Sequence, residues 1–321
     1  MKRSALLLLA FVSLQAGGQP YPSKPVRVIN PFPPGGPLDV LGRVMSERLG
    51  AALGRPVVIE NKPGAAGNIG AAEVAKAAPD GYTVLLTLFS IVTSNPHLYE
   101  RLPFDPLKDF APITALATTD SVLIVHPSVP AASVKELIAH AKANPGTLNY
   151  ASAGKASPGH LTAEFFSRQT GAAFTHVPYK GNAEAIRSVL AGDTQIMFTP
   201  TTGALAHIKA GKLKAIAVYP GERIDELPGV AGIGAQGVSG FDARGLPFWY
   251  GMLAPGATPR EIVMRLNAES VKVLQDAQID KALRAARIFP IGNTPEEFGA
   301  MMREGHAAWG RVIRETGVKG E

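Results

Sequence analysis

Residues 26–44 of the chain read VRVINPFPPGGPLDVLGRV, which runs from a short apolar segment through a Pro/Gly turn into a regular apolar pattern. Residues 26–29, with the β-branched Val26, Val28 and Ile29, predict a buried strand, and Pro31 to Gly36 predict the turn that ends it. Beyond the turn, apolar residues recur at the spacing of an amphipathic helix: Val40, Leu41, Val44, Leu49 and Leu53. The segment therefore predicts a strand, a turn and a helix, in that order.

A second stretch repeats this order. Residues 57–59 (VVI) predict a strand, and the turn GAAGNIG at residues 64–70 opens another helical pattern. If both strands lie parallel in one sheet, both turns lie at its carboxyl edge, where free backbone N–H groups and helix dipoles favour an anion. One glycine-rich turn often only reverses the chain, but two at the same edge predict a carboxylate or phosphate site without a metal.

The N-terminus has the pattern of a signal peptide. Met1-Lys2-Arg3 precedes an uncharged stretch, residues 5–14, that is too short to span a bilayer, and Ala16-Gly17-Gly18 fits a cleavage site. We expect residues 1–18 to be removed and the mature protein to be soluble in the periplasm. The chain has no cysteine, which excludes disulfides and a lipid-modified N-terminal cysteine.

The composition argues against nucleic acid as a partner. The chain has 32 Lys and Arg against 26 Asp and Glu, and loss of Lys2 and Arg3 leaves 30 against 26, a net charge of about +4. The mature chain of roughly 300 residues is long for one core and suits two domains of ordinary size.

Strand and helix patterns alternate along the chain in two series. The first runs from residue 26 to about residue 119, with a third strand at 83–87. The second contains strand patterns at 122–126, 149–151, 175–177, 195–199 and 214–218, with helices between them. After an apolar run at 248–254 come three helical segments, at about 258–275, 279–287 and 295–316.

This terminal block of helices has no predicted strand of its own, so we expect it to cover the first sheet. The prediction is an α/β fold of two lobes, each a sheet flanked by helices. Residues 19–120 and 244–321 form domain 1, and residues 121–243 form domain 2. Because ligands bind open α/β sheets at the carboxyl ends of strands, we place the ligand cleft between the domains.

Seven blocks occur in order along the mature chain: residues 21–27, 31–36 with Asp39, 67–70, 78–82, 177–181, 207–212 and 249–251. Together they resemble the Bug-type receptors, the solute-binding receptors of tripartite tricarboxylate transporters, from about Tyr21 to the end. The resemblance implies a type II, Venus-flytrap periplasmic binding protein that closes on a small organic anion, usually a carboxylate. In this family one carboxylate end is held by the two turns of domain 1, largely through backbone amides and ordered water.

The resemblance implies ligand contacts from both domains. In domain 1 the matching positions are Pro34, Gly35, Gly36 and Asp39, followed by Ala66, Gly67, Asn68 and Ile69 in the second turn. In domain 2 they are Ser152, Ala153, Gly154 and His160, followed by Tyr179, Lys180 and Gly181. Asp39 and Asn68 also fit a purely local role, because Asp and Asn satisfy the free N–H groups at helix starts.

Two segments depart from the family pattern. Leu88-Phe89-Ser90-Ile91 stands where a small polar cluster is common, and Thr199 with the residues after it stands where an acidic or amide residue is usual. Phe89, Ser90 and Thr199 are therefore further candidate ligand contacts. A bulkier and less charged pocket predicts a ligand with one carboxylate and an apolar or aromatic body.

We expect a monomer without a cofactor that binds and releases its ligand, and whose closed form is recognised by membrane permease subunits or by a sensor. A periplasmic serine hydrolase is the alternative, because Ser152 and Lys155 have the Ser-x-x-Lys spacing in which lysine activates serine. The Ser-Asp-Asn and Lys-Thr-Gly motifs that accompany this spacing are absent from the sequence. The seven histidines include no His-Glu-x-x-His motif, so no metal site is predicted.

Overall fold

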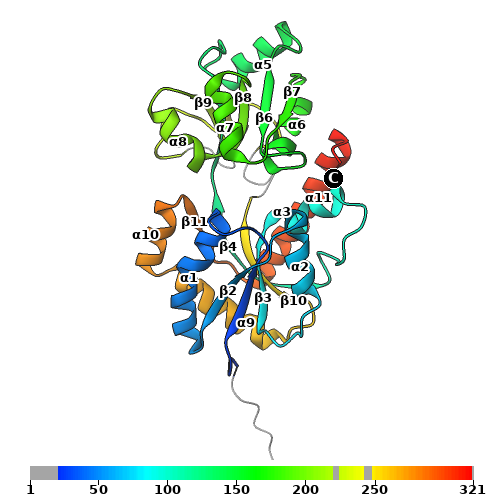
Figure 1. The fold of residues 1–321 in the computed structure, drawn as a ribbon, viewed down its shortest axis with the longest axis vertical. Helices are drawn as coiled ribbons and strands as arrows, with labels where there is room; N and C mark the ends of the chain where they lie inside the picture. The colour runs from blue at the N-terminus through cyan, green and yellow to red at the C-terminus, as the bar shows by residue number, and fades with distance from the viewer. Residues whose placement is uncertain (1–20, 220–223, 242–247, 320–321) are drawn as a thin grey trace, which may run out of the picture.

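The computed structural model describes residues 21–219, 224–241 and 248–319. The expected signal peptide, residues 1–18, lies outside these ranges. Within them the chain forms two lobes, each with one β-sheet and helices packed on it, stacked along the long axis of the molecule (Figure 1).

The first lobe contains a six-stranded sheet in the order β11-β4-β10-β3-β1-β2. Its strands are β1 (Val26–Asn30), β2 (Val57–Asn61), β3 (Thr83–Leu88), β4 (Phe110–Thr119), β10 (Tyr250–Pro255) and β11 (Ile288–Pro290). Its helices are α1 (Pro37–Leu53), α2 (Asn68–Ala75), α3 (Phe89–Thr93), α4 (Asn95–Leu98), α9 (Arg260–Leu274), α10 (Ala277–Ala285) and α11 (Pro295–Thr316). β1 pairs in parallel with both β2 and β3, so the turns after these strands share one edge of the sheet.

The second lobe contains a five-stranded sheet in the order β7-β6-β8-β5-β9. Its strands are β5 (Ser121–Val125), β6 (Asn149–Ser152), β7 (Thr175–Pro178), β8 (Ile196–Pro200) and β9 (Lys214–Tyr219). Its helices are α5 (Val134–Ala143), α6 (Pro158–Thr170), α7 (Asn182–Ala191) and α8 (Thr201–Lys209). The chain enters this lobe through Asp120, between β4 and β5, and β10 belongs to the sheet of the first lobe again.

The expectation that the terminal block has no strand is wrong. β11 lies between the second and third helices of the block and pairs antiparallel with β4. The apolar run before the block contributes β10, which lies between β3 and β4 and pairs antiparallel with both. β4 itself was not predicted, because its sequence FAPITALATT is rich in Ala and Thr and shows no clear alternation. A central strand acquires its stability from the neighbours on both sides, which the local sequence does not reveal.

An aromatic cluster joins the cores of the two lobes. The Phe248 ring lies 4.7 Å from Phe89, 5.7 Å from Tyr219 and 5.9 Å from Trp309, measured between ring centroids. Trp309 belongs to α11, which starts on the first lobe and also contacts α6 of the second. Burial of apolar surface therefore favours this arrangement of the lobes.

Candidate functional site

A cavity of about 390 Å³ lies between the two lobes. Most of its wall is apolar, and both lobes contribute aromatic side chains. The first lobe contributes Phe32, Pro33, Pro34, Gly36, Pro37, Leu38, Asp39, Leu88, Phe89, Thr119, Phe248 and Tyr250. The second contributes Ser121, Ala153, Ser157, Pro158, Gly159, Asn182, Phe198, Pro200 and Tyr219.

Helix N-termini from both lobes meet at this cavity. The start of α1 lines it with Gly36, Leu38 and Asp39, whose amide N–H groups have no hydrogen-bond partner among the described residues. From the second lobe come the start of α6, residues 157–159, and Asn182, the first residue of α7. No Lys, Arg or His side chain lines the described part of the cavity, and what this part offers to an anion is helix dipoles and backbone amides.

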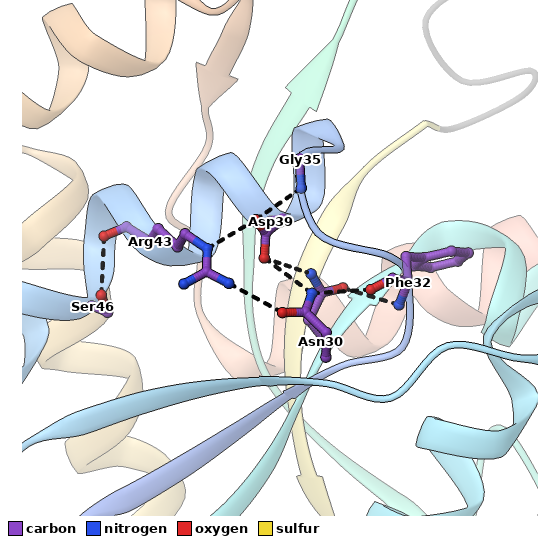
Figure 2. Close-up of polar contacts among 7 residues, drawn as sticks. Asn30, Phe32, Gly35, Asp39, Arg43 and Ser46 are labelled. Carbon is purple, nitrogen blue, oxygen red and sulfur yellow. Dashed lines mark hydrogen bonds and ion pairs between the residues drawn. The ribbon is translucent and has the colours of Figure 1, made fainter.

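The first turn is held in shape by the Asp39 carboxylate (Figure 2). Asp39 Oδ2 accepts hydrogen bonds from the Gly35 N–H at 3.0 Å and from Arg43 Nε at 2.9 Å. Gly35 has φ +88°, a conformation that favours glycine. The Arg43 guanidinium, helped by the Gly35 amide and the Asn61 side chain, holds the pKa of the Asp39 carboxyl well below its usual range. Asp39 is therefore ionised, and its charge is compensated by Arg43.

The second turn, residues 64–70, touches the first turn but does not line the cavity. Asn95 Nδ2 fixes it by donating to the Ala66 carbonyl at 3.2 Å and to Asn68 Oδ1 at 2.8 Å. A Cβ at Gly67 would lie 3.1 Å from the Phe32 ring, so Phe32, which lines the cavity, is packed against this turn. The side chain of Ile69 is exposed. A direct role for residues 66–69 in ligand binding stays a prediction.

The whole chain has close relatives. The sequence model described as tripartite tricarboxylate transporter family receptor matches residues 41–318. The chain belongs to this receptor family. Protein BugT of Bordetella pertussis is 33% identical over 311 residues, which are 97% of this chain and 94% of BugT.

Solved structures of similar proteins share the fold of this receptor. The periplasmic binding protein BugD is 31% identical with a TM-score of 0.77, over 94% of this chain and 100% of BugD. A protein from R. palustris, solved with adipate, is 32% identical with a TM-score of 0.80, over 94% of this chain and 100% of that protein. MatC from Rhodopseudomonas palustris, solved with bound malate, is 28% identical with a TM-score of 0.76, over 91% of this chain and 100% of MatC. The expected two-lobed α/β fold of a periplasmic binding protein is confirmed.

The segments that depart from the family pattern lie close to the cavity of the receptor. Phe89 lines it, together with Leu88, whereas Ser90 does not. Thr199 is buried, and its hydroxyl has no hydrogen-bond partner in the described part of the chain, while its neighbours Phe198 and Pro200 line the cavity. The third and eighth strands thus end in apolar side chains at the cavity.

Of the second-lobe candidates, Ala153 lines the cavity, and Ser152, Gly154, His160, Tyr179, Lys180 and Gly181 do not. The Ser152 side chain is fully buried, and its Oγ lies 2.9 Å from the Gly154 carbonyl oxygen and 2.7 Å from His176 Nε2. No hydrogen bond joins it to Lys155 in the described residues. A buried hydroxyl with these partners fixes the loop after β6 and offers no approach to a substrate.

Sequence reasoning missed the contribution of the α6 and α7 starts. A signal for the first was present, since Ser157-Pro158 combines an N-cap residue with proline at the first helical position. Gly181-Asn182 is a similar signal for α7. Neither shows which helix start faces the other lobe, because that depends on how the two sheets are arranged.

Two stacked histidines lie beneath the start of α6. The ring centroids of His160 and His176 are 3.9 Å apart, and His160 Nδ1 accepts a hydrogen bond from the Ala156 N–H at 2.8 Å. Burial, with Lys155 nearby, lowers the pKa of His160 to about 4, and burial together with His160 lowers the pKa of His176 to about 4. Both rings are therefore neutral at pH 7.

Acidification is expected to destabilise the receptor before its carboxylates are protonated. Histidine in an unfolded chain titrates near pH 6.5, so between about pH 6.5 and 4 the unfolded state binds protons that folded His160 excludes. The stabilisation that neutral His160 contributes to the folded state is fully present above this window and decreases as the pH falls through it. We expect the free energy of unfolding in urea to fall by about 2 kcal/mol from pH 7 to pH 5 for His160 alone.

The variant His160→Gln is the control for this pH dependence. It removes one titrating ring, and His97, whose pKa burial also lowers, is unchanged. We expect its stability to depend less on pH between 7 and 5. An equal loss in the variant and in the wild type would contradict the assignment.

Proposed function

We propose that this protein captures a small organic carboxylate in the cavity between its lobes and presents the closed form to membrane permease subunits, or to a sensor. It is exported through cleavage of residues 1–18 and works in the periplasm as a monomer. Domain 1, residues 19–120 and 244–321, closes on domain 2, residues 121–243, around the crossings near residues 120 and 243, the second of which lies outside the described residues. A partner that prefers the closed form then senses the bound ligand by population shift.

The observation that carries this proposal is the convergence of helix starts on a cavity whose described lining residues include no Lys, Arg or His. The unpaired amides at the start of α1, with the starts of α6 and α7, supply donors and positive potential for one carboxylate. The relatives solved with adipate and malate support a carboxylate as ligand.

The rest of the cavity favours a ligand with an apolar body. Leu88, Phe89, Phe198 and Phe248 form much of its wall, and the one charged side chain among the described lining residues is Asp39, whose charge is already compensated. Burying an apolar group against such walls is favourable by about 25 cal/mol per Å². We infer one carboxylate on an aromatic or aliphatic body. A binding screen in which succinate or aspartate bound more tightly than every aromatic acid would contradict this.

Binding without turnover is part of the proposal. The buried state of Ser152 and its hydrogen bonds within the loop favour a structural role over that of a nucleophile. A catalytic rate that disappears in Ser152→Ala would contradict a receptor without activity.

Asn182→Asp is expected to weaken carboxylate binding about tenfold, because it adds a negative charge at the cavity without a change of shape. The same substitution puts an acidic residue in the first turn of α7, where the helix dipole stabilises it by about 0.3–1 kcal/mol. Affinity should therefore fall while the free energy of unfolding is kept. Calorimetric titration and urea unfolding measure the two quantities.

Asn182→Ser is the matched control, because it removes the amide and adds no charge. We expect the affinity of this variant to stay within about threefold of the wild type. If both variants lost the same affinity, the charge at this position would not matter, and the proposed position of the carboxylate would be wrong.

A further inference from the structure

The Asp39 carboxylate faces the cavity region but is saturated by the protein itself. Besides Gly35 N–H and Arg43 Nε on Oδ2, its Oδ1 accepts from Asn61 Nδ2 at 3.0 Å and from Asn30 Nδ2 at 3.4 Å. A carboxylate has about four lone-pair sites, so these four donors occupy it fully. Its side chain is 5% exposed. Asp39 therefore has no acceptor left for a ligand.

The donors come from different elements and tie them together (Figure 2). Asn30 ends β1, Asn61 ends β2, and Arg43 lies one turn further along α1. Asn61 Nδ2 also donates to the Phe32 carbonyl at 3.0 Å, and the Phe32 N–H donates to Asn30 Oδ1 at 3.2 Å. Arg43 in turn donates through Nη2 to Asn61 Oδ1 at 3.1 Å. The network fixes the first turn, and with it the N–H groups that face the cavity.

The charge of Asp39 creates a difficulty that Arg43 resolves. A carboxylate in the first turn of α1 opposes a second carboxylate bound at the same helix start, since like charges in a poorly solvated site repel. Among the residues that the structure describes, Arg43 is the cation that contacts Asp39, and its own side chain is 55% exposed and does not line the cavity. It compensates the charge from the side away from the ligand.

We propose that Arg43 is a positioning residue for ligand binding: it neutralises Asp39 without touching the ligand, so that the start of α1 stays attractive to a carboxylate. Asp39 and Asn61 hold the turn, and Arg43 sets its net charge. This inference rests on the proposed function and adds a residue outside the cavity that determines affinity.

Calorimetric titration of four forms of the protein tests the proposal. Sodium benzoate, adipate and malate are titrated into the wild type. The acid that the wild type binds most tightly is then titrated into each variant. We expect Arg43→Met to bind about tenfold more weakly, and Arg43→Lys, which keeps the charge, to bind within about twofold of the wild type. The double variant Asp39→Asn/Arg43→Met removes both charges, and Asn keeps the shape of Asp, so it should recover most of the lost affinity.

Recovery in the double variant separates charge from shape. If Arg43 acted only through the geometry of the turn, the double variant would bind no better than Arg43→Met, and the proposal would be overturned. Wild-type affinity in Arg43→Met would overturn it as well. Circular dichroism and urea unfolding confirm that each variant is folded. A wild type that binds none of the three acids overturns the proposed function itself, and the inference with it.

Discussion

Arg287→Met is expected to lower the free energy of unfolding by about 3–5 kcal/mol. Arg287 is 6% exposed, immediately precedes β11, and forms ion pairs with Asp120, at the crossing between the lobes, and with Glu226. Its removal leaves the Asp120 carboxylate, which is 11% exposed, without its cation. An unpaired charge in a buried site is costly, whereas the pair itself contributes little net stability. Urea unfolding followed by circular dichroism measures the loss.

Glu226→Gln is the control for this ion-pair cluster. Glu226 is 40% exposed, and Arg287 keeps Asp120 as partner when it is neutralised. We expect a loss below about 1 kcal/mol, as for other solvent-exposed pairs. A loss in Arg287→Met that is no larger than the loss in Glu226→Gln would show that burial does not determine the energetics of this cluster.

Phe248→Ala is expected to cost about 3–5 kcal/mol of stability and to alter ligand selectivity. Phe248 is 8% exposed, belongs to the aromatic cluster that joins the lobes, and lines the cavity. Its truncation removes ring contacts from both cores and enlarges the space for a ligand. Relative to the wild type, the variant should prefer bulkier acids. Thermal unfolding with and without a series of aromatic acids of increasing size measures both effects.

Phe104→Ala provides a comparison of equal chemistry away from the cavity. Phe104 is 6% exposed and packs against Phe110 in the first lobe, with ring centroids 5.4 Å apart. It should cost a similar amount of stability and leave the order of ligand preference unchanged. A change of preference in both variants would mean that general loosening, and not the cavity wall, alters selectivity.

The sequence contains strong local signals for the elements at the first turn. The strand, turn and helix expected from residues 26–53 appear as β1, the turn with Gly35 in a left-handed conformation, and α1. In the second lobe the strand expected at 175–177 is β7, and one of the helices expected between the strands is α7. These elements were predictable because turn residues and apolar periodicity agree along them.

Contacts between distant segments were not predictable in the same way. β4 is a strand because it pairs with β10 on one side and with β11 on the other, and β11 is a strand because it pairs with β4. Their own sequences are short of alternating apolar residues. Phe248 and Tyr219 meet through the arrangement of the two sheets, although they are 29 positions apart in the numbering of the chain. Periodicity gives the faces of elements, whereas the walls of an interlobe cavity depend on tertiary packing.

The candidate site also combines residues that the sequence predicts with residues that only the packing of the two lobes brings to the cavity. Pro34, Gly36 and Asp39 line the cavity as part of a recognisable turn, and Phe89 and Ala153 follow strands that the pattern revealed. Trp249 is buried and packs edge-on against Phe298, whereas its neighbour Tyr250 lines the cavity. These two adjacent aromatic residues, at the start of β10 and just before it, have different surroundings, and the sequence alone does not say which of them lies at the ligand cavity.

Native mass spectrometry of the mature protein, as purified and after addition of a panel of carboxylic acids, tests the central claim most directly. The account predicts one organic acid per chain, released intact on denaturation, with binding lost when the carboxylate is replaced by the primary amide. Such an acid should also raise the apparent stability, by about 2.7 kcal/mol at one hundred times its dissociation constant. A protein that binds none of the acids, binds the amides equally well, or releases a chemically altered product would contradict the account.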